Sequence, residues 1–246
     1  MCRPVFAAAI SLISATALIA QENKQTPVTF KTEVSKELTL HYLLSVPEGF
    51  DASDKSKKWP LVVFLHGAGE RGDDLEKVKI HGPPKLVAAG KKFPFVLISP
   101  QCPKDSWWTK EPVLELIEDA EKHYNIDPNR IYLTGLSMGG YGTWHFATEA
   151  PARFAAIVPI CGGGTPYFVR RITHVPVWAF HGAKDTVIPL QESERLIEVL
   201  KKRGNKQVKL TVYPNAGHDS WTEAYNTEAL FRWLLSHSRQ EKKKNG

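Results

Sequence analysis

The sequence predicts a single α/β domain built on a mostly parallel central sheet of about eight strands, with helices on both faces. Short, continuous apolar runs recur along the chain, and a strand without a polar face is typical of a parallel sheet covered on both sides. Helical segments alternate with these runs across short connections, which is the pattern of a layered α/β fold. The 246 residues fall within the usual size of one large domain, and no repeat or Pro/Ser-rich linker divides them.

The first 20 residues predict a secretory signal peptide. Arg3 precedes an unbroken run of small and apolar residues from Val5 to Ala20, after which the chain becomes polar. A short membrane anchor is the alternative, but the run is shorter than the ~20 apolar residues needed to cross a bilayer. We therefore expect one mature domain over 21–246, secreted or periplasmic, without membrane contact beyond the signal peptide. Leu18 stands where a small residue is preferred, so the cleavage site stays open.

The charge of the chain does not favour a nucleic-acid partner. The formal net charge is +6, and the stretch from Arg239 to Gly246 supplies a good part of the excess. Such a basic end is typical of a solvated tail. Basic residues are not interleaved with aromatic ones as they are in platforms that bind single strands. We expect no nucleic-acid partner, and the sequence leaves the oligomeric state open.

Two cysteines remain once Cys2 leaves with the signal peptide. Cys102 and Cys161 each follow a predicted strand at the same edge of the sheet. Cysteines in an oxidising compartment can pair, but two positions at one edge can lie too far apart for a disulfide. We favour two separate buried thiols and keep the disulfide as the alternative.

Four segments in the first part of the chain predict strands. Residues 28–32 and 37–46 alternate between apolar and polar side chains, which indicates a hairpin at the sheet edge. Trp59–Leu65 and Phe93–Ser99 are continuous apolar runs, which indicate strands buried on both faces.

A helix and a turn are expected next. Residues 111–124 place apolar side chains at helical spacing, with glutamates on the other side, which indicates an amphipathic helix. Asp127–Arg130 then predicts a turn that leads into the following strand.

The stretch from Ile131 to Trp144 organises the interpretation of the rest. It contains a G-x-S-x-G pattern centred on Ser137, between an apolar run and residues that can open a helix, which is the context of a nucleophile elbow. Gly135 and Gly139 suit this turn because strand and helix backbones approach closely and the central residue has strained dihedrals. The pattern also occurs by chance in loops, so it needs partners elsewhere in the chain.

Strands and helices continue to alternate after the elbow. Pro151 marks the end of the elbow helix, and helical spacing predicts further helices over 190–202 and 222–237. Apolar runs predict strands over 154–160 and 175–180, and a further strand is expected over 208–213.

Ligands of open parallel sheets bind at the carboxyl ends of the strands, and a glycine-rich loop follows the first buried strand there. We predict that the backbone amides of Ala68 or Gly69, together with that of Met138, form an oxyanion hole. A phosphate-binding loop is the alternative, but the glycine spacing matches neither the dinucleotide nor the nucleoside-triphosphate pattern.

An acid and a histidine follow two later strands. Asp185 lies in a turn after one strand, where an acid can orient a histidine; the alternative is that it caps the next helix. Glu192 and Glu194 are other candidate acids, but both lie at or inside that helix. His218 follows the last strand and occupies the final position in the order Ser, Asp, His.

Two other histidines also stand at strand ends. His66 and His181 each precede a glycine turn, so we expect both to shape their loops.

With these residues, the sequence resembles the α/β-hydrolase family. More narrowly, it resembles the secreted esterases that include bacterial feruloyl and acetylxylan esterases. Members of this group are also labelled predicted peptidases because they are similar to the catalytic domain of prolyl oligopeptidases. The resemblance extends from about Leu38 to Leu235 and rests on residues 65–74, 99–103, 126–144, 181–185 and 217–218. It implies serine carboxylic-ester hydrolysis without a cofactor or metal, with Ser137, Asp185 and His218 as the triad.

The substrate is less well specified than the reaction. Four aromatic residues are expected in the loops at the rim of the site, where flat rings can bind an aromatic acid or a sugar: Trp107, Trp108, Trp221 and Tyr167. The alternative is that these rings only pack against the rest of the protein. The resemblance favours a small-molecule or polysaccharide ester of plant cell walls. A serine peptidase of the prolyl-oligopeptidase type and a non-catalytic binding module remain as alternative functions.

Overall fold

The computed structural model describes residues 29–32 and 37–239 and divides the chain into two units, Met1–Glu37 and Leu38–Gly246. Residues 29–32 of the first unit form neither helix nor strand. The predicted signal peptide over residues 1–20 lies outside the described residues. No helix in the described ranges is long and apolar enough to cross a membrane.

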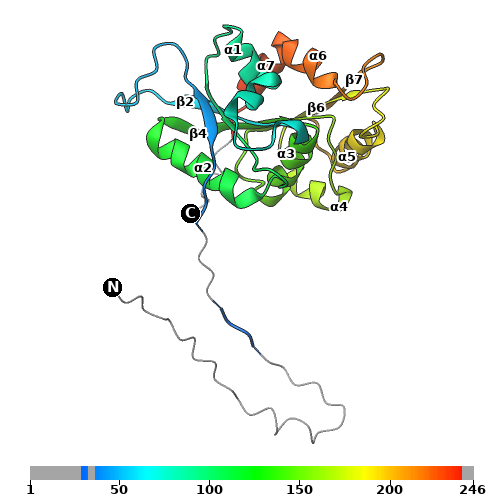
Figure 1. The fold of residues 1–246 in the computed structure, drawn as a ribbon. Coiled ribbons are helices and arrows are strands. Elements are labelled where there is room, and N and C mark those ends of the chain that lie inside the picture. Colours follow the sequence, from blue (N-terminus) through cyan, green and yellow to red (C-terminus); the bar gives the residue numbers. More distant parts are fainter. Residues whose placement is uncertain (1–28, 33–36, 240–246) are drawn as a thin grey trace, which may run out of the picture. The chain divides into compact units, whose positions relative to one another are not determined.

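A seven-stranded sheet forms the centre of the second unit, among the residues that the structure describes (Figure 1). Its order is β1-β3-β2-β4-β5-β6-β7, with β1 antiparallel to β3 and the other neighbours parallel. The strands are β1 (Tyr42–Ser45), β2 (Trp59–Leu65), β3 (Val96–Pro100), β4 (Ile126–Leu136), β5 (Ala156–Ile160), β6 (Val177–Gly182) and β7 (Val208–Tyr213). The predicted fold class is confirmed, with seven strands in place of about eight.

Helices cover both faces of the sheet (Figure 1). One layer contains α2 (Lys110–His123), α3 (Met138–Glu149), α4 (Pro166–Val169) and α5 (Gln191–Lys202). The other contains α1 (Gly82–Ala88), α6 (Ser220–Asn226) and α7 (Glu228–Leu235). Short 3₁₀ helices occupy the connections: η2 (Ala68–Glu70), η3 (Leu75–Ile80) and η4 (Arg170–Ile172).

The strand period of two divides the apolar side chains of the sheet between two cores. In β2, Leu61, Val63 and Leu65 pack with α2, α3 and α5, whereas Val62 and Phe64 pack with α6 and α7. All five side chains are fully buried. Burial of a side chain of this size stabilises the fold by roughly 1.5–3 kcal/mol. A continuous apolar run is therefore what a central strand of this sheet requires.

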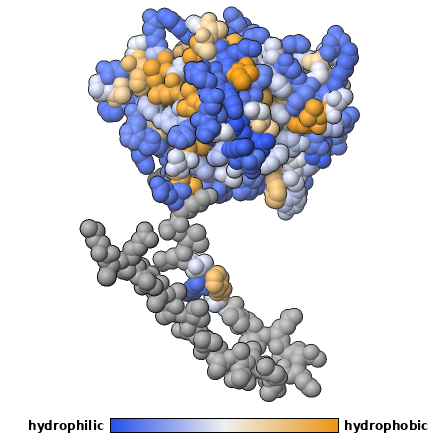
Figure 2. All heavy atoms as spheres, in the orientation of Figure 1, coloured by the Kyte–Doolittle hydropathy of each residue, from blue (hydrophilic) through white to orange (hydrophobic). Residues whose placement is uncertain are grey.

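The outer surface of the second unit carries hydrophobic residues in separate groups. Figure 2 shows the face in view mainly in blue, with orange residues gathered in several patches. The large exposed hydrophobic side chains after β3 and before α5 include Trp107, Tyr167, Phe168 and Val187.

The predicted hairpin at the sheet edge is wrong. The described residues 29–32 form no strand, and β1 pairs instead with β3, with Tyr42 opposite Pro100 and Ser45 opposite Leu97. The alternating pattern identified a half-buried edge strand, but a local pattern does not specify which strand it will pair with.

Two other predicted elements, a turn and a helix, differ from the structure. Asp127–Arg130 lies inside β4 as an irregular stretch, where the pairing with β2 shifts in register, rather than as a turn before it. The predicted helix over 222–237 is two helices, α6 and α7. Thr227 between them has extended dihedrals and uses its hydroxyl to donate to the carbonyl of Glu223, which ends the first helix.

The sequence missed α1 because its first residues do not suggest a helix. Gly82 has a positive φ of 68°, and Pro83 and Pro84 follow it. Prolines are tolerated in the first helical turn, where the backbone N–H has no intrahelical partner.

The elbow brings three backbone segments into close approach. A Cβ at Gly139 would lie against the backbone carbonyl of Leu65, and one at Gly135 against the carbonyl of Gly139, both closer than van der Waals contact allows. Glycine is therefore required at both positions for α3 to begin where it does.

We predict that Gly139→Ala destabilises the protein by about 3 kcal/mol, because backbone atoms cannot move aside for the added methyl group. The midpoint of thermal unfolding should fall by roughly 10 °C. Gly69→Ala is the matched control, since nothing lies within 4 Å of a Cβ there. Circular dichroism during heating compares the two, and equal midpoints would contradict the close approach.

Candidate active site

The elbow holds Ser137 in a strained conformation at the end of β4. Its φ of 53° and ψ of −116° lie outside the regions that a serine usually adopts. Its backbone N–H donates to the carbonyl of Ile160 at 3.0 Å, and its own carbonyl accepts the N–H of Tyr141 at 3.0 Å. The neighbouring strand and the first turn of α3 therefore hold the serine in place.

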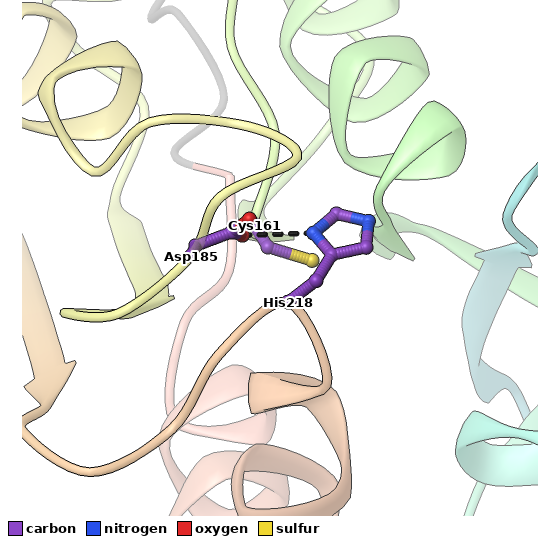
Figure 3. Close-up of side chains that lie close together, drawn as sticks. All are labelled: Cys161, Asp185 and His218. Atoms are coloured by element: carbon purple, nitrogen blue, oxygen red, sulfur yellow. Dashed lines mark hydrogen bonds and ion pairs between the residues drawn. The ribbon is translucent and has the colours of Figure 1, made fainter.

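The structure brings Ser137, Asp185 and His218 together from three different parts of the chain. His218 Nε2 lies 2.9 Å from Ser137 Oγ, and His218 Nδ1 lies 2.8 Å from Asp185 Oδ2. Figure 3 shows the second of these contacts, with the imidazole ring turned toward the carboxylate. A carboxylate can only accept, so we assign the ring proton to Nδ1 and leave the Nε2 lone pair to accept the Ser137 hydroxyl.

The loop after β6 fixes the Asp185 carboxylate. Its Oδ1 accepts the backbone N–H groups of Val187 and Ile188, each at 2.9 Å. Burial on its own raises the pKa of this carboxyl, but the hydrogen bonds from His218, Ile188 and Val187 outweigh burial and hold the pKa below its ordinary value. Asp185 is therefore ionised at neutral pH, as an acceptor for His218 must be.

The other candidates for the acid and the base have different partners. His181 lies 3.4 Å from Asp185, but its ring nitrogens bond Ser193 Oγ and the carbonyl of Ile188, so it shapes the loop as expected. Glu192, in the first turn of α5, pairs with Arg195.

One predicted oxyanion-hole residue, Met138, directly follows the nucleophile, and the other two, Ala68 and Gly69, lie in the loop after β2. Met138 is the first residue of α3, so its backbone N–H has no intrahelical acceptor. Ala68 and Gly69 begin η2, directly after Gly67. A Cβ at Gly67 would lie 3.6 Å from Ser137 Cβ, so this loop starts beside the serine. The role of these amides remains a prediction.

His66 anchors the glycine-rich loop from inside the protein. It is fully buried; its Nε2 accepts the N–H of Cys102 at 2.9 Å, and its Nδ1 lies 2.6 Å from the carbonyl of Gly67. Trp108 Nε1 donates to the His66 carbonyl at 3.0 Å. Burial lowers the pKa of His66 from 6.5 to about 4, so the ring is neutral.

A cavity of about 320 Å³ opens beside the elbow. Met138 and Tyr141 from α3 line it, and Trp107, Trp108 and Phe168 supply aromatic walls. Trp107 is 63% exposed, whereas Trp108 is 8% exposed. Trp107 therefore offers a free ring face, while Trp108 is mainly a packed wall.

Trp221, the third predicted substrate-binding residue, lies against the histidine instead. Its ring is perpendicular to that of His218, with centroids 5.2 Å apart. Its indole Nε1 donates to His81 Nδ1 at 3.3 Å. The three tryptophans, which the sequence grouped as one rim, therefore occupy two separate places.

Sequence reasoning missed a buried carboxylate and a histidine near the elbow. Glu70 is 6% exposed; its Oε1 lies 3.6 Å from His81 Nε2, and its Oε2 has no hydrogen-bond partner among the described residues. Because Trp221 donates to His81 Nδ1, the His81 proton belongs on Nε2, facing Glu70. Glu70 lies in the glycine-rich segment after β2, where the sequence could have marked it as a candidate site residue. No local pattern indicated His81.

Cys102 and Cys161 are two buried free thiols, as the sequence favoured. Burial raises the pKa of the Cys102 thiol to about 11 and that of Cys161 to about 12.

Comparison with known proteins places this arrangement in a family. The sequence profile of the dienelactone hydrolase family matches residues 104–234, more than half of the chain. A bifunctional acetylxylan esterase/xylanase of Neocallimastix patriciarum is 29% identical over 151 residues, which cover 56% of this chain and 21% of that protein. A probable feruloyl esterase C of Aspergillus terreus is 23% identical over 181 residues, covering 72% of this chain and 66% of that protein. The chain thus spans less than two thirds of the length of either relative.

Solved structures agree on the fold. A thermostable esterase is 37% identical and superposes with a TM-score of 0.68, covering 80% of this chain and 59% of that chain. An acylaminoacyl peptidase of Pyrococcus horikoshii has a TM-score of 0.60 at 17% identity, covering 86% of this chain and 42% of that chain. At 17% identity, the similarity to the acylaminoacyl peptidase shows a shared fold alone.

The buried, neutral state of His66 predicts a loss of stability in mild acid. As the pH falls from 6.5 toward about 4, the unfolded chain takes up a proton at this ring that the folded chain does not, so the free energy of unfolding decreases. The contribution of His66 is on the order of 3 kcal/mol by pH 4. Urea unfolding at pH 7 and pH 4.5 measures it. His66→Gln should lose less stability between these pH values than the parent protein. Equal losses would contradict a lowered pKa for His66.

Proposed function

Because this chain belongs to the dienelactone hydrolase family, we propose that it is a serine esterase that hydrolyses carboxylic esters through an acyl-enzyme. The observation that carries the proposal is the hydrogen-bonded series from Ser137 through His218 to Asp185, with lengths of 2.9 and 2.8 Å. Such a series gives an otherwise weak hydroxyl nucleophile a base that can take its proton.

In the first half of the proposed reaction, His218 Nε2 takes the proton of Ser137 as Oγ attacks the ester carbonyl carbon. The carbonyl oxygen becomes an oxyanion, which the amides of Met138 and of Ala68 or Gly69 stabilise by donating hydrogen bonds. His218 then returns the proton to the leaving alcohol as the ester bond breaks. Asp185 stabilises the imidazolium while it exists.

In the second half, water replaces the alcohol. His218 takes a proton from the water as its oxygen attacks the acyl carbonyl, and the proton then passes to Ser137 Oγ as the acid leaves. Each group returns to its starting protonation state, so the cycle needs no cofactor.

We propose feruloyl or acetyl esters of plant polysaccharides as substrates of a secreted or periplasmic enzyme. The aromatic walls of the cavity beside Met138 favour a substrate with a flat acyl group, because offset or edge contacts between rings contribute binding free energy beyond that of burial. The relatives described as acetylxylan and feruloyl esterases support the same class. The expected signal peptide supports the location.

Substitution of the proposed triad should abolish turnover without unfolding the protein. We expect Ser137→Ala to reduce kcat/KM for p-nitrophenyl acetate by several powers of ten and Asp185→Asn by roughly 10⁴. Asp219→Asn is the matched control, because Asp219 is exposed next to His218 and its carboxylate accepts from Thr222. Near-parent activity in Ser137→Ala would refute the proposal.

The identity of the ester should depend on the exposed wall of the cavity. We expect Trp107→Ala to raise KM for methyl ferulate about fivefold, since an aromatic contact contributes about 1 kcal/mol, and to leave p-nitrophenyl acetate unaffected. Tyr167→Ala is the control, because Tyr167, although expected at the rim, is not among the residues that line the cavity and its exposed ring contacts Arg170. Acetylated xylan and an acyl-peptide complete the substrate panel. Cleavage of the peptide in preference to every ester would indicate a peptidase instead.

A further inference from the structure

Cys161 is a buried nucleophilic group that the proposed reaction does not use. It follows β5 directly, and its backbone N–H donates to the carbonyl of Phe180 at 2.9 Å. Its φ of 37° is unusual for a residue with a side chain, and the residue is fully buried. The hydrogen bond between the ends of β5 and β6 thus fixes the backbone of Cys161, and rotation of its side chain sets the position of the sulfur.

The Cys161 thiol lies against the acid and the histidine of the site. Its Sγ, a carboxylate oxygen of Asp185 and a ring nitrogen of His218 all lie within 4.8 Å of one another. Figure 3 shows the sulfur pointing toward the His218 ring, on the side where the ring meets Asp185. The three residues follow β5, β6 and β7, so neighbouring strand ends place them around one point.

Thiolate, imidazole and carboxylate together are a typical ligand set for zinc. Zinc binds sulfur at about 2.3 Å and nitrogen or oxygen at about 2.0–2.2 Å, so its ligand atoms lie roughly 3.3–3.7 Å apart. The Asp185–His218 contact of 2.8 Å would open by about 0.5 Å, and the sulfur would move inward by at most about 1 Å. These shifts are within reach of side-chain rotation.

We propose that Zn²⁺ binds to Cys161 Sγ, Asp185 and His218 Nδ1, and that it inhibits the enzyme reversibly. A water molecule is the fourth ligand. The inference rests on the proposed function for its inhibitory effect, whereas the metal site itself depends only on the geometry of the three side chains.

The proton balance explains why the bound metal would stop catalysis. The thiol loses its proton to solvent and bonds the metal as thiolate. The neutral imidazole keeps its single proton, but Zn²⁺ on Nδ1 moves that proton to Nε2. Nε2 then becomes a donor, and it can no longer accept the proton of Ser137.

Access to the site is through the histidine. The His218 side chain is 21% exposed, whereas those of Asp185 and Cys161 are buried. His218 follows Gly217 in the loop after β7, and the backbone of this loop packs closely on Gly182, so the side chain of His218 rather than the loop has to move. Because His218 must move to admit the ion, we expect inhibition to develop slowly after mixing.

Cd²⁺ serves as the probe that reports binding without catalysis. Titration of the full protein should produce a thiolate-to-metal charge-transfer absorbance that saturates at one ion per chain. The band should be absent from Cys161→Ala and Cys161→Ser and present in Cys102→Ala, which removes the other buried thiol. His218→Ala keeps the thiol, and its affinity for Cd²⁺ should fall at least about tenfold.

Zn²⁺ inhibition of p-nitrophenyl acetate hydrolysis is the second readout. Each variant is compared with its own metal-free rate, and EDTA should restore that rate. We expect the concentration for half inhibition to rise at least about tenfold in Cys161→Ala and to stay unchanged in Cys102→Ala. Equal inhibition of Cys161→Ala and the parent, or a Cd²⁺ band that survives in both Cys161 variants, would overturn the metal site. If the parent protein hydrolyses no ester, the proposed function fails, and the Cd²⁺ absorbance still decides the site.

Discussion

The close approach of three backbone segments at the elbow is the constraint on which the rest of the site depends. Gly139 packs against the carbonyl of Leu65, which joins the start of α3 to the end of β2. Ser137 is thereby held at a φ of 53°, with its hydroxyl 2.9 Å from His218 Nε2. The neighbouring buried strand β5 supports this conformation, because the N–H of Ser137 donates to the carbonyl of Ile160 at the end of that strand.

The chemistry of the site arises from neighbouring strand ends rather than from any one segment. Asp185 follows β6 and His218 follows β7, and pairing of these strands sets the two side chains at hydrogen-bonding distance. Burial alone would disfavour a charged carboxylate at this point. Two backbone amides and the imidazole compensate for the lost water, so the same loop that buries Asp185 also keeps it ionised.

Sequence patterns predicted the central elements closely and the peripheral ones poorly. Trp59–Leu65 was predicted at its observed bounds, because burial on both faces imposes a composition that is visible locally. The edge strand Val208–Tyr213 was also predicted at its observed bounds. The partner of β1 and the break at Thr227 were not predicted, since both depend on contacts distant in the chain. The glycine-rich loop was recognised, but the Glu70–His81–Trp221 contacts within and beside it were not.

The sequence by itself determined the α/β class, the succession of the main strands and helices along the chain, and the three residues proposed for catalysis. Apolar periodicity and the steric demand for glycine are properties of short segments, so they can be recognised without coordinates. Only the tertiary structure decided that Trp221 packs on His218 while Trp107 borders a cavity, and that Cys161 lies beside Asp185. Those relations depend on how the strand ends converge in space, and no pattern within one segment encodes a distance to another.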